Sequence, residues 1–222
     1  MTATLETVIP AAEVEVEGLA HHYAPGRGLD PLSFVIAAPG AVAVTGPNGS
    51  GKSTLLRILA GLLRPNRGRV RVSMAGAAIA AGSRRGAIGY AGPELAFYEE
   101  LSAAENLGFA AEALGIQGAR ESVSATLARV GLERRAQDRV AALSSGMKQR
   151  LRIAFALLER PPLLLLDEPG SHLDDDGRAM VARVVGEQAR LGLVVLATND
   201  EREWKLAEQR IELRGRGLGH PA

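Results

Sequence analysis

The chain has 222 residues, of which 46% are hydrophobic and 23% charged, and its formal net charge is +1. This composition is typical of an ordinary globular protein with one good-sized α/β domain, and the near-zero charge argues against a general nucleic-acid or membrane-surface binder. There is no cysteine, which excludes disulfides and thiolate-bound metals, and the sequence has neither the pattern of a signal peptide nor an apolar run of about 18 residues.

The first third of the chain alternates short apolar runs with turns. Residues 1–12 are expected to form a loose leader. The runs that follow have the length and the alternating or buried character of strands. The predicted strands are VEVEGL (14–19), LSFVI (32–36), AVAVT (41–45) and the alternating part of RPNRGRVRVS (64–73). Between the last two strands, a Gly-rich loop leads into a helix that ends near residue 63.

Residues 94–158 change in character, because apolar positions recur at helical spacing and strand-like runs are absent. Ser102 and Glu105 form the S-x-x-E pattern of a capping box, which predicts that a helix begins there. The predicted helices are 100–115, 119–132 and 144–159. We therefore expect a helical subdomain inserted into an α/β core.

The last third returns to strands that alternate with helices. Two of these strands are strongly apolar and end in polar side chains. The predicted elements are the strand within LLLLDEP (163–169), a helix over 175–191, the strand LVVLA (193–197), a helix over 201–209, the strand RIEL (210–213) and a flexible tail over 214–222. This alternation predicts an α/β fold with a mostly parallel core sheet covered by helices.

The segment GPNGSGKST (46–54) matches the pattern G-x-x-x-x-G-K-[ST] and lies between a buried strand and a helix, which is the context that this motif requires. Its glycines let the backbone turn sharply and point N–H groups inward, where the helix dipole adds positive potential. Lys52 would contact the β- and γ-phosphates of a nucleotide, and the Ser53 hydroxyl would contact Mg²⁺. A chance Gly-rich turn is the alternative. The predicted nucleotide-binding residues are Gly46, Pro47, Asn48, Gly49, Ser50, Gly51, Lys52, Ser53 and Thr54.

The segment LLLLDEP (163–169) carries two acids at the carboxyl end of a buried strand. Open parallel sheets bind their ligands at this end. Asp167 is therefore placed to help hold Mg²⁺, and Glu168 is placed to accept a proton from an attacking water as a general base. The alternative is that the two acids merely cap the next helix.

The segment LSSGMKQR (143–150) resembles the LSGGQ-type signature of ATP-binding cassette (ABC) proteins, and it precedes the acidic strand, as it does in that family. Together with the phosphate loop and LLLLDEP, the resemblance covers about residues 13–213. It implies a single ABC ATPase domain, which is a P-loop NTPase fold with an antiparallel β edge subdomain and a helical subdomain inserted at about 94–158. It also implies ATP and Mg²⁺ as ligands.

The same resemblance implies roles for further residues. Tyr23 would stack on the adenine ring, and Asp174 would reach across a dimer interface. Two cassettes would pair head to tail, so that the signature of one chain binds the ATP held by the other. The signature residues that would act in this way are Ser144, Ser145 and Gly146, which are small residues at a helix N-terminus.

Three places depart from the family pattern. The signature has Ser145 and Met147 where the family usually has glycine and glutamine, which leaves the backbone donors in place. The glutamine that usually precedes the helical insertion aligns with Pro93, beside Glu94, whose carboxylate is a candidate substitute. The switch histidine is replaced by Asn199, which can hydrogen-bond a γ-phosphate but has no proton to exchange near neutral pH. We therefore expect hydrolysis with a slower turnover.

The remaining aromatic and imidazole side chains do not form a recognisable ligand set. Trp204 is expected to anchor the last helix. The histidines, expected at surface or turn positions and not in a metal cluster, are His21, His22, His172 and His220.

The leading interpretation is the ATP-hydrolysing subunit of an ABC transporter at the cytoplasmic face of the cell membrane. Its implied partners are separate membrane subunits and a second cassette, in a homo- or heterodimer, and no nucleic acid. The segment from Ala91 to Phe109 would form part of a groove for a coupling helix of the membrane subunit. The compact length favours export, and GPELAFYEEL and ATND are most similar to the haem-exporter type used in cytochrome c maturation.

Three alternatives to haem export remain open. The first is an exporter of lipid, drug or peptide. The second is a degenerate cassette that binds ATP as a switch with weak hydrolysis, which the changes at Pro93 and Asn199 motivate. The third is a non-transport ABC ATPase that acts on ribosomes or DNA.

Overall fold

The computed structural model describes residues 10–24, 27–84 and 87–214. The predicted leader and tail therefore lie mostly outside the described residues. The strands are β1 (Ala12–Ala24), β2 (Arg27–Ala37), β3 (Gly40–Thr45), β4 (Arg67–Met74), β5 (Ala77–Ile79), β6 (Ile88–Ala91), β7 (Leu163–Asp167), β8 (Leu193–Ala197) and β9 (Gln209–Glu212). The helices are α1 (Lys52–Leu59), α2 (Ala103–Ala113), α3 (Ala119–Arg129), α4 (Ser145–Leu157), α5 (Asp175–Ala189) and α6 (Glu201–Trp204), with 3-10 turns at Ala81–Ser83, Glu133–Arg135 and Val140–Ala142.

Five strands form a parallel sheet in the order β6-β7-β8-β3-β9. Side chains alternate between the faces of a strand, and a parallel sheet covered on both faces therefore needs apolar residues at every position. On β7, Leu164 and Leu166 pack into the core on one face, while Leu163 and Leu165 pack into the core on the other. This requirement explains the unbroken leucine run of the sequence.

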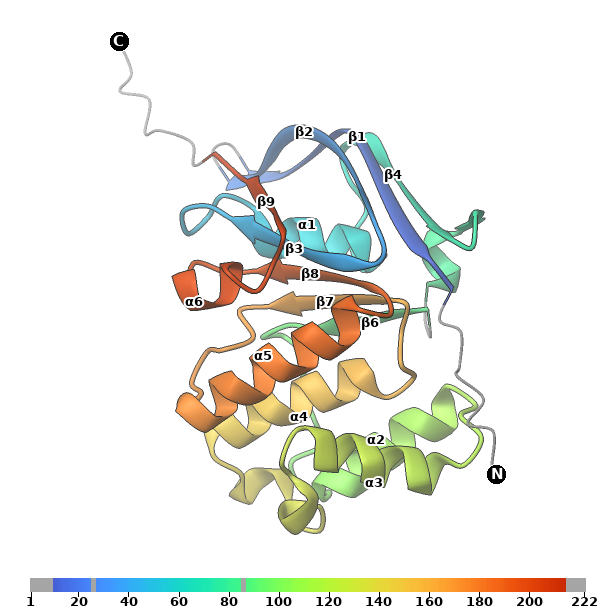
Figure 1. Cartoon of the computed structure of the whole chain (residues 1–222), viewed down its shortest axis with the longest axis vertical. Coiled ribbons are helices and arrows are strands. Elements are labelled where there is room, and N and C mark those ends of the chain that lie inside the picture. The colour runs from blue at the N-terminus through green and yellow to red at the C-terminus, as the bar shows by residue number, and fades with distance from the viewer. Residues whose placement is uncertain (1–9, 25–26, 85–86, 215–222) are drawn as a thin grey trace.

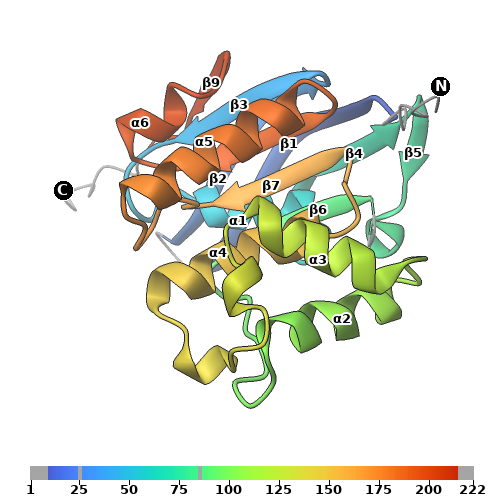
Figure 2. The same ribbon diagram turned by 60° about the horizontal axis from the view of Figure 1, so that its bottom comes forward.

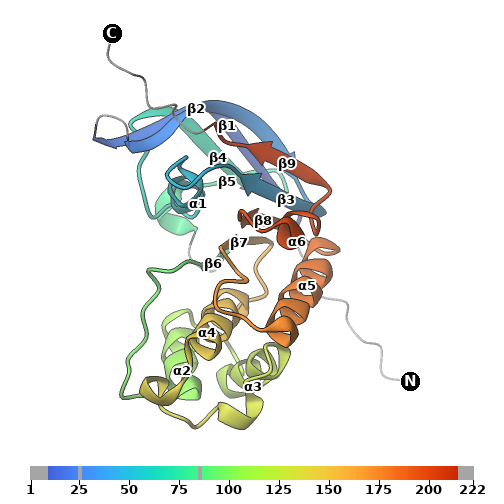
Figure 3. The same cartoon turned by 90° about the vertical axis from the view of Figure 1, so that its left-hand side faces the viewer.

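Helix α1 lies between the parallel sheet and a second sheet, which is antiparallel with the order β2-β1-β4-β5 (Figure 1). It contacts β7 and β8 of the first sheet and β2 and β4 of the second. Helices α4 and α5 cover the opposite face of the parallel sheet, and Figure 3 shows α1 and α5 on its two sides. Because α1 is enclosed by both sheets, the loop that leads into it has a fixed position.

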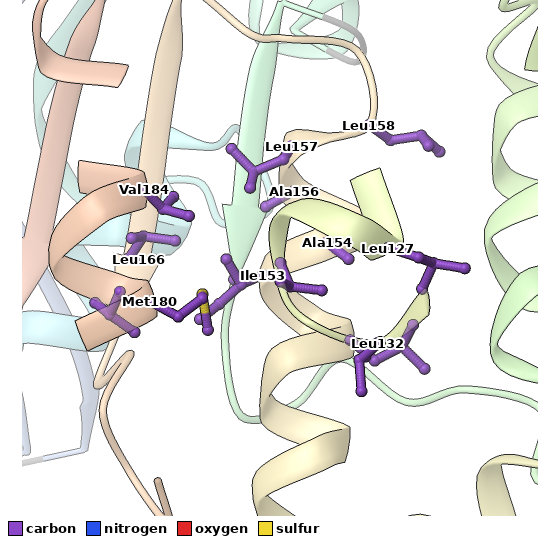
Figure 4. Close-up of a cluster of buried hydrophobic side chains, with 14 of the residues drawn as sticks. Leu127, Leu132, Ile153, Ala154, Ala156, Leu157, Leu158, Leu166, Met180 and Val184 are labelled. Carbon is purple, nitrogen blue, oxygen red and sulfur yellow. The ribbon is translucent and has the colours of Figure 1, made fainter. Parts of the chain in front are cut away.

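Helices α2, α3 and α4 pack together as a helical layer away from the antiparallel sheet, as Figure 2 shows. Helix α4 joins this layer to the α/β core. Figure 4 shows Ile153 of α4 beside Met180 of α5, with Leu127 of α3 on the other side of α4. All three side chains are buried. One continuous apolar core therefore connects the helical layer to the sheet.

Helix α2 begins with the predicted capping box, which the structure confirms. The Ser102 hydroxyl accepts a hydrogen bond from the Glu105 N–H at 3.1 Å, and the Glu105 carboxylate accepts one from the Ser102 N–H at 2.7 Å. The two side chains therefore satisfy donors that the first turn of a helix leaves unpaired.

Substituting Ser102 by alanine should lower the free energy of unfolding by about 1 kcal/mol, because the Glu105 N–H in the first turn loses its acceptor. Urea denaturation followed by circular dichroism measures this difference. The matched control is Ser124→Ala, because Ser124 is exposed within α3 and no cap depends on it. Equal stability of Ser102→Ala and the wild type would contradict the capping assignment.

The structure differs from the predicted elements at several places, one of which is the unpredicted strand β5, which pairs with β4. Strand β6 was not predicted, and it forms because Ile88–Ala91 pairs in parallel with β7. Helix α6 ends at Trp204, although a helix over 201–209 was predicted. Gln209 begins β9, which pairs with β3, and the Glu208 carboxylate accepts a hydrogen bond from the Ala41 N–H at 2.7 Å. Tertiary pairing thus overrides the local helical pattern.

Candidate functional site

The carboxyl ends of β3, β7 and β8 meet at one edge of the parallel sheet. Val44 of β3 and Asp167 of β7 both pair with Ala197 of β8. The segments that follow these three strands therefore leave the sheet side by side, at the edge where parallel α/β sheets bind ligands. The register brings together the Gly-rich loop (46–51), the acids of β7 and Asn199.

At two positions of the Gly-rich loop, the backbone conformation and its surroundings accommodate only glycine. Gly46 has a φ of 144° and Gly51 a φ of 102°, which residues with a Cβ atom rarely adopt. A Cβ atom at Gly46 would lie 2.4 Å from the Leu213 carbonyl oxygen, and one at Gly51 would lie 2.9 Å from the Gly28 carbonyl oxygen. The loop therefore packs directly against the segments that end β9 and begin β2.

Lys52 is the first residue of α1, and its side chain is 7% exposed. Its ammonium group folds back over the loop and donates to the carbonyl oxygens of Gly46 at 2.8 Å and Pro47 at 3.4 Å. No carboxylate of the described residues forms an ion pair with it. A buried ammonium at a helix N-terminus, held only by carbonyl groups, is positioned to bind an anion.

Asp167, at the end of β7, is 2% exposed, and its carboxylate oxygens are buried with only the Ser53 side chain as a nearby hydrogen-bonding group. Burial raises the pKa of Asp167, and the nearby Ser53 and Lys52 side chains only partly offset this effect. A buried carboxylate that lacks an ion-pair partner is costly unless a cation binds it, and carboxylate and hydroxyl oxygens are ligands that Mg²⁺ prefers. Asp167 with Ser53 therefore fits a magnesium ion.

Glu168 follows directly and is half-buried. Its φ is 50°, in the left-handed region that is strained for a residue with a side chain and that occurs at functional sites. The Glu168 N–H donates to the Ala197 carbonyl at 2.8 Å. Burial raises the pKa of Glu168, and although Lys52 lowers it, the nearby Glu203 carboxylate adds to the rise. Such a carboxylate accepts protons more readily than an ordinary glutamate does.

Asn199 lies directly across from the Gly-rich loop. Its side-chain amide donates to the Asn48 Oδ1 atom at 2.9 Å, and both side chains are exposed. The segment after β8 thus contacts the loop through two amides. Thr198 and Asp200 fix the backbone beside it, because the Asp200 N–H donates to the Thr198 hydroxyl at 3.0 Å.

Tyr23 lies in strand β1 and is 53% exposed. Its ring makes an edge contact with the His21 ring, with centroids 4.6 Å apart. The Thr54 hydroxyl lies 3.5 Å from the Tyr23 hydroxyl. The tyrosine thus stands beside the Gly-rich loop with much of its ring accessible.

The signature residues Ser144, Ser145 and Gly146 lie at the start of α4, which covers the face of the parallel sheet opposite to α1 and its Gly-rich loop, as Figure 1 shows. Ser144 caps the helix by accepting from the Met147 N–H at 3.2 Å, and Ser144 and Ser145 are exposed. Asp174 caps α5, and its carboxylate also accepts from Arg150 at 3.1 Å. In this chain alone, Asp174 is therefore occupied by contacts within its own molecule.

The segment after β6 contains Pro93 and Glu94, which are both exposed. The Glu94 Oε1 atom accepts from the Arg57 guanidinium at 2.7 Å and from the Tyr90 hydroxyl at 2.8 Å. The negative charge of Glu94 also contributes to the raised pKa of Asp167. The sequence did not single out Arg57 and Tyr90. The sequence shows only that a cation and a hydroxyl lie on other elements. It does not reveal that both side chains contact Glu94.

An apolar groove with a volume of about 480 Å³ runs beside β6 and the helical layer. Tyr98 and Phe109 pack edge to face across it, with ring centroids 6.0 Å apart, and each is more than half exposed. Leu95 and Phe97, which follow Glu94, also line the groove. Exposed aromatic residues gathered in this way are typical of surfaces that bind another molecule.

The histidines show one further difference from expectation. His21 is buried in β1, where its Nδ1 atom lies 2.9 Å from the Arg64 carbonyl, while His22 and His172 are exposed and His220 lies outside the described residues. Within the described ranges, no group of three or more His, Cys, Asp or Glu side chains is placed to hold a metal.

The Trp204 ring packs under the Arg210 guanidinium at 4.1 Å. No described helix is long and apolar enough to cross a membrane.

Comparison with known proteins places this site in a family. Residues 29–171 match the family model described as ABC transporter. The chain is 37% identical over 171 residues to the cytochrome c biogenesis ATP-binding export protein CcmA of Cupriavidus pinatubonensis, covering 76% of this chain and 75% of that protein. It is 34% identical over 197 residues to the Fe(3+) ions import ATP-binding protein FbpC of Mesorhizobium japonicum, covering 86% of this chain and 54% of that protein.

A solved structure of the ATP-binding subunit of an ABC transporter shares 31% identity with this chain, with a TM-score of 0.79 over 92% of this chain and 88% of that one. Against some other curated relatives, the chain spans only about three fifths of their length. The matched region contains the Gly-rich loop, the signature and the acidic strand, which are the segments that build the site. The chain therefore belongs to the ABC transporter family, with the fold of its ATP-binding cassettes.

Proposed function

We propose that this chain binds and hydrolyses ATP as the nucleotide-binding subunit of a transporter, paired with a second cassette beneath separate membrane subunits. The observation that carries this proposal is the meeting of Lys52 with Asp167 and Glu168 at the sheet edge where β3 and β7 flank β8. These groups are a cation for phosphate, an oxygen ligand for Mg²⁺ and a carboxylate with a raised pKa.

The chain's own residues have separable roles in this reaction. The loop N–H groups and Lys52 bind the phosphates, so Lys52 exchanges its carbonyl partners for phosphate oxygens. Ser53 and Asp167 would hold Mg²⁺, which when bound neutralises charge that develops on the phosphates. Glu168 takes a proton from the attacking water at its carboxylate. Asn199 orients the γ-phosphate by hydrogen bonding, and Tyr23 stacks on the adenine.

The direct test is release of phosphate from ATP by the purified chain at pH 7.5, with and without Mg²⁺. We expect steady-state hydrolysis that is lost when a chelator removes the metal. Hydrolysis that does not depend on Mg²⁺ would contradict the role of Asp167, and the absence of hydrolysis, alone and with a membrane partner, would contradict the enzymatic function.

The exposed signature supports pairing with a second cassette, as a homo- or heterodimer. Ser144, Ser145 and Gly146 lie at the start of α4, on the other side of the parallel sheet from the helix that follows the phosphate loop, which supports a role toward the nucleotide of another chain. Asp174 would then exchange its Arg150 contact for one across the interface. ATP would join the two cassettes, and its hydrolysis would release them.

The apolar groove supports docking of a cytoplasmic helix from a membrane subunit, and our proposal includes a location of the chain at the cytoplasmic face of the membrane. An amphipathic helix would cover Tyr98 and Phe109 and lie against Leu95.

We extend the proposal to export, with haem for cytochrome c maturation as the cargo, because the segments GPELAFYEEL and ATND resemble those of haem-exporter cassettes. Stimulation of ATP hydrolysis by haem, and not by lipids, drugs or peptides, in the reconstituted complex would test the cargo.

A second candidate function is an ATP-dependent switch that barely hydrolyses ATP. One observation favours it: Glu94, the neighbour of Pro93, is held by Arg57 and Tyr90 and is therefore less free to replace the missing glutamine. Under this alternative the chain binds ATP and forms the cassette pair, but single-turnover hydrolysis is slow. A hydrolysis rate within the ordinary enzyme range of about 1–10³ s⁻¹ would exclude it.

Substituting Asn199 by histidine should preserve or raise turnover at neutral pH, because histidine makes the same hydrogen bond and can also exchange protons. The wild-type rate should fall as pH decreases through the raised pKa of Glu168, because only the ionised carboxylate accepts a proton. Asn199 adds no ionisation to this profile, whereas histidine adds one near its ordinary pKa of about 6.5. A pH–rate profile of both proteins measures this, and a large loss of turnover in the variant would mean that the site is adapted to asparagine.

A further inference from the structure

The strained backbone of Glu168 is held by a side chain from α4. The Glu168 carbonyl accepts from the Ser171 N–H at 3.1 Å and from the Gln149 Nε2 atom at 3.3 Å. The same Gln149 amide donates to the Pro169 carbonyl at 3.2 Å. Gln149 is 5% exposed, so the amide bridges two consecutive carbonyl groups inside the protein. A residue with a φ of 50° persists only where its surroundings fix it, and Gln149 is part of that surrounding.

The other end of the Gln149 amide is fixed in turn. Its Oε1 atom accepts from the Arg152 Nη1 atom at 3.1 Å, one turn further along α4. The oxygen faces a guanidinium and the nitrogen faces carbonyl groups, so both ends of the amide have complementary partners. Among the ion pairs of the described residues, none includes Arg152. Its guanidinium therefore donates hydrogen bonds to uncharged oxygen atoms and does not pair with a carboxylate.

Arg152 also contacts the segment that follows β6. Its Nε atom donates to the Leu95 carbonyl at 3.1 Å. Leu95 lines the apolar groove, and it follows directly on Glu94. A continuous set of hydrogen bonds thus leads from the groove wall, through Arg152 and Gln149, to the backbone of Glu168. The contacts at the two ends of this set join α4 to segments that lie elsewhere in the sequence, and the contact between Arg152 and Gln149 lies within α4.

We propose that Gln149 and Arg152 are positioning residues that hold Glu168 in its left-handed conformation and connect it to the wall of the groove. A partner that moves the Leu95 segment would shift Arg152 and, through Gln149, the Glu168 carbonyl. This inference rests on the proposed role of Glu168. It assigns neither residue a contact with ATP, so their loss should affect catalysis and not nucleotide binding.

The test uses the full chain with Gln149→Met, Arg152→Met and the double variant. Methionine keeps the length of the side chain and removes the hydrogen bonds. We expect each single variant to lower kcat by about tenfold to a hundredfold, because small displacements of a catalytic group have effects of this size. The KM for ATP should stay within about twofold. Because the two residues act in series, the double variant should lose no more than the larger single effect.

A second readout does not depend on hydrolysis. In the nucleotide-free chain, amide hydrogen exchange at Glu168 and Ser171 should accelerate in both single variants, by about threefold to tenfold relative to amides of β8 in the same molecule. The matched controls are Gln188→Met, because Gln188 is equally buried and donates to the Pro161 carbonyl, and Arg183→Met, because Arg183 donates to the Arg129 carbonyl. Neither control should change kcat or the local exchange at Glu168.

The outcomes separate this inference from the proposed function. Wild-type hydrolysis with an unchanged kcat and unchanged exchange in Arg152→Met and Gln149→Met would overturn the positioning role and leave the ATPase function intact. Effects of the two substitutions that multiply in the double variant would also overturn it, because independent residues act additively in free energy. An inactive wild type would contradict the proposed function, and the exchange measurement would still decide whether the two residues hold Glu168.

Discussion

Substituting Glu168 by glutamine should lower steady-state ATP hydrolysis by about 10²- to 10⁴-fold, the range that general base catalysis contributes. Glutamine keeps the size of the side chain and the backbone contacts to Ala197 and Ser171. It cannot accept the proton of the attacking water. ATP should therefore bind with near-normal affinity and remain intact, so that the ATP-bound pair of cassettes accumulates. Phosphate release and size-exclusion chromatography with light scattering measure the two effects.

The control for this variant is Glu187→Gln on α5, which removes a carboxylate paired with Arg129 outside the site. It should hydrolyse ATP at the wild-type rate. Wild-type turnover in Glu168→Gln would exclude Glu168 as the base. A Glu168→Gln protein that binds ATP but stays monomeric would contradict the paired-cassette arrangement and leave the assignment of the base untouched.

Substituting Lys52 by methionine should weaken ATP binding by about tenfold to a hundredfold, which corresponds to the about 1.5–3 kcal/mol of a hydrogen bond to a charged group. The reason is that Lys52 is the buried cation of the loop and is already directed over it by the Gly46 and Pro47 carbonyls. Hydrolysis at subsaturating ATP should fall at least in proportion. Isothermal titration calorimetry measures the affinity.

The chain offers a matched control for this substitution in Lys205→Met, because Lys205 is an exposed lysine on the surface whose partner is Glu201. Its affinity for ATP should equal that of the wild type. Thermal unfolding of both variants shows whether the fold is retained. A folded Lys52→Met protein with unchanged affinity would remove Lys52 from the phosphate site.

Several features of the fold and site could be read from local patterns. The Gly-rich loop, the leucine run of β7 and the capping box at Ser102 each depend on a few neighbouring residues. The chemistry of each is complete within that stretch: glycine allows a tight turn, a doubly covered strand needs apolar residues on both faces, and the Ser–Glu pair satisfies a helix end. These predictions therefore needed no knowledge of distant contacts.

Other features could not be read in this way. The predicted length of α6 was wrong because pairing with β3 fixes β9 directly after it. Strand β6 was not predicted because a strand this short forms through its pairing with β7, which its own residues do not reveal. The engagement of Glu94 by Arg57 and Tyr90 joins three separate elements. Sequence spacing carries no information about such meetings.

The sequence by itself determined the family and the kinds of groups available: a cation for phosphate, two acids at a strand end and an asparagine where a histidine is usual. Only the tertiary structure decided how those groups are held. It places the Asn199 side chain against Asn48 and buries the Asp167 carboxylate without an ion-pair partner. It also places the Gln149 amide, which accepts from Arg152, in hydrogen-bond contact with the carbonyl of the strained Glu168. The physical reason is that identity follows from local chemistry, whereas hydrogen bonding, burial and strain depend on which distant segments the fold brings together.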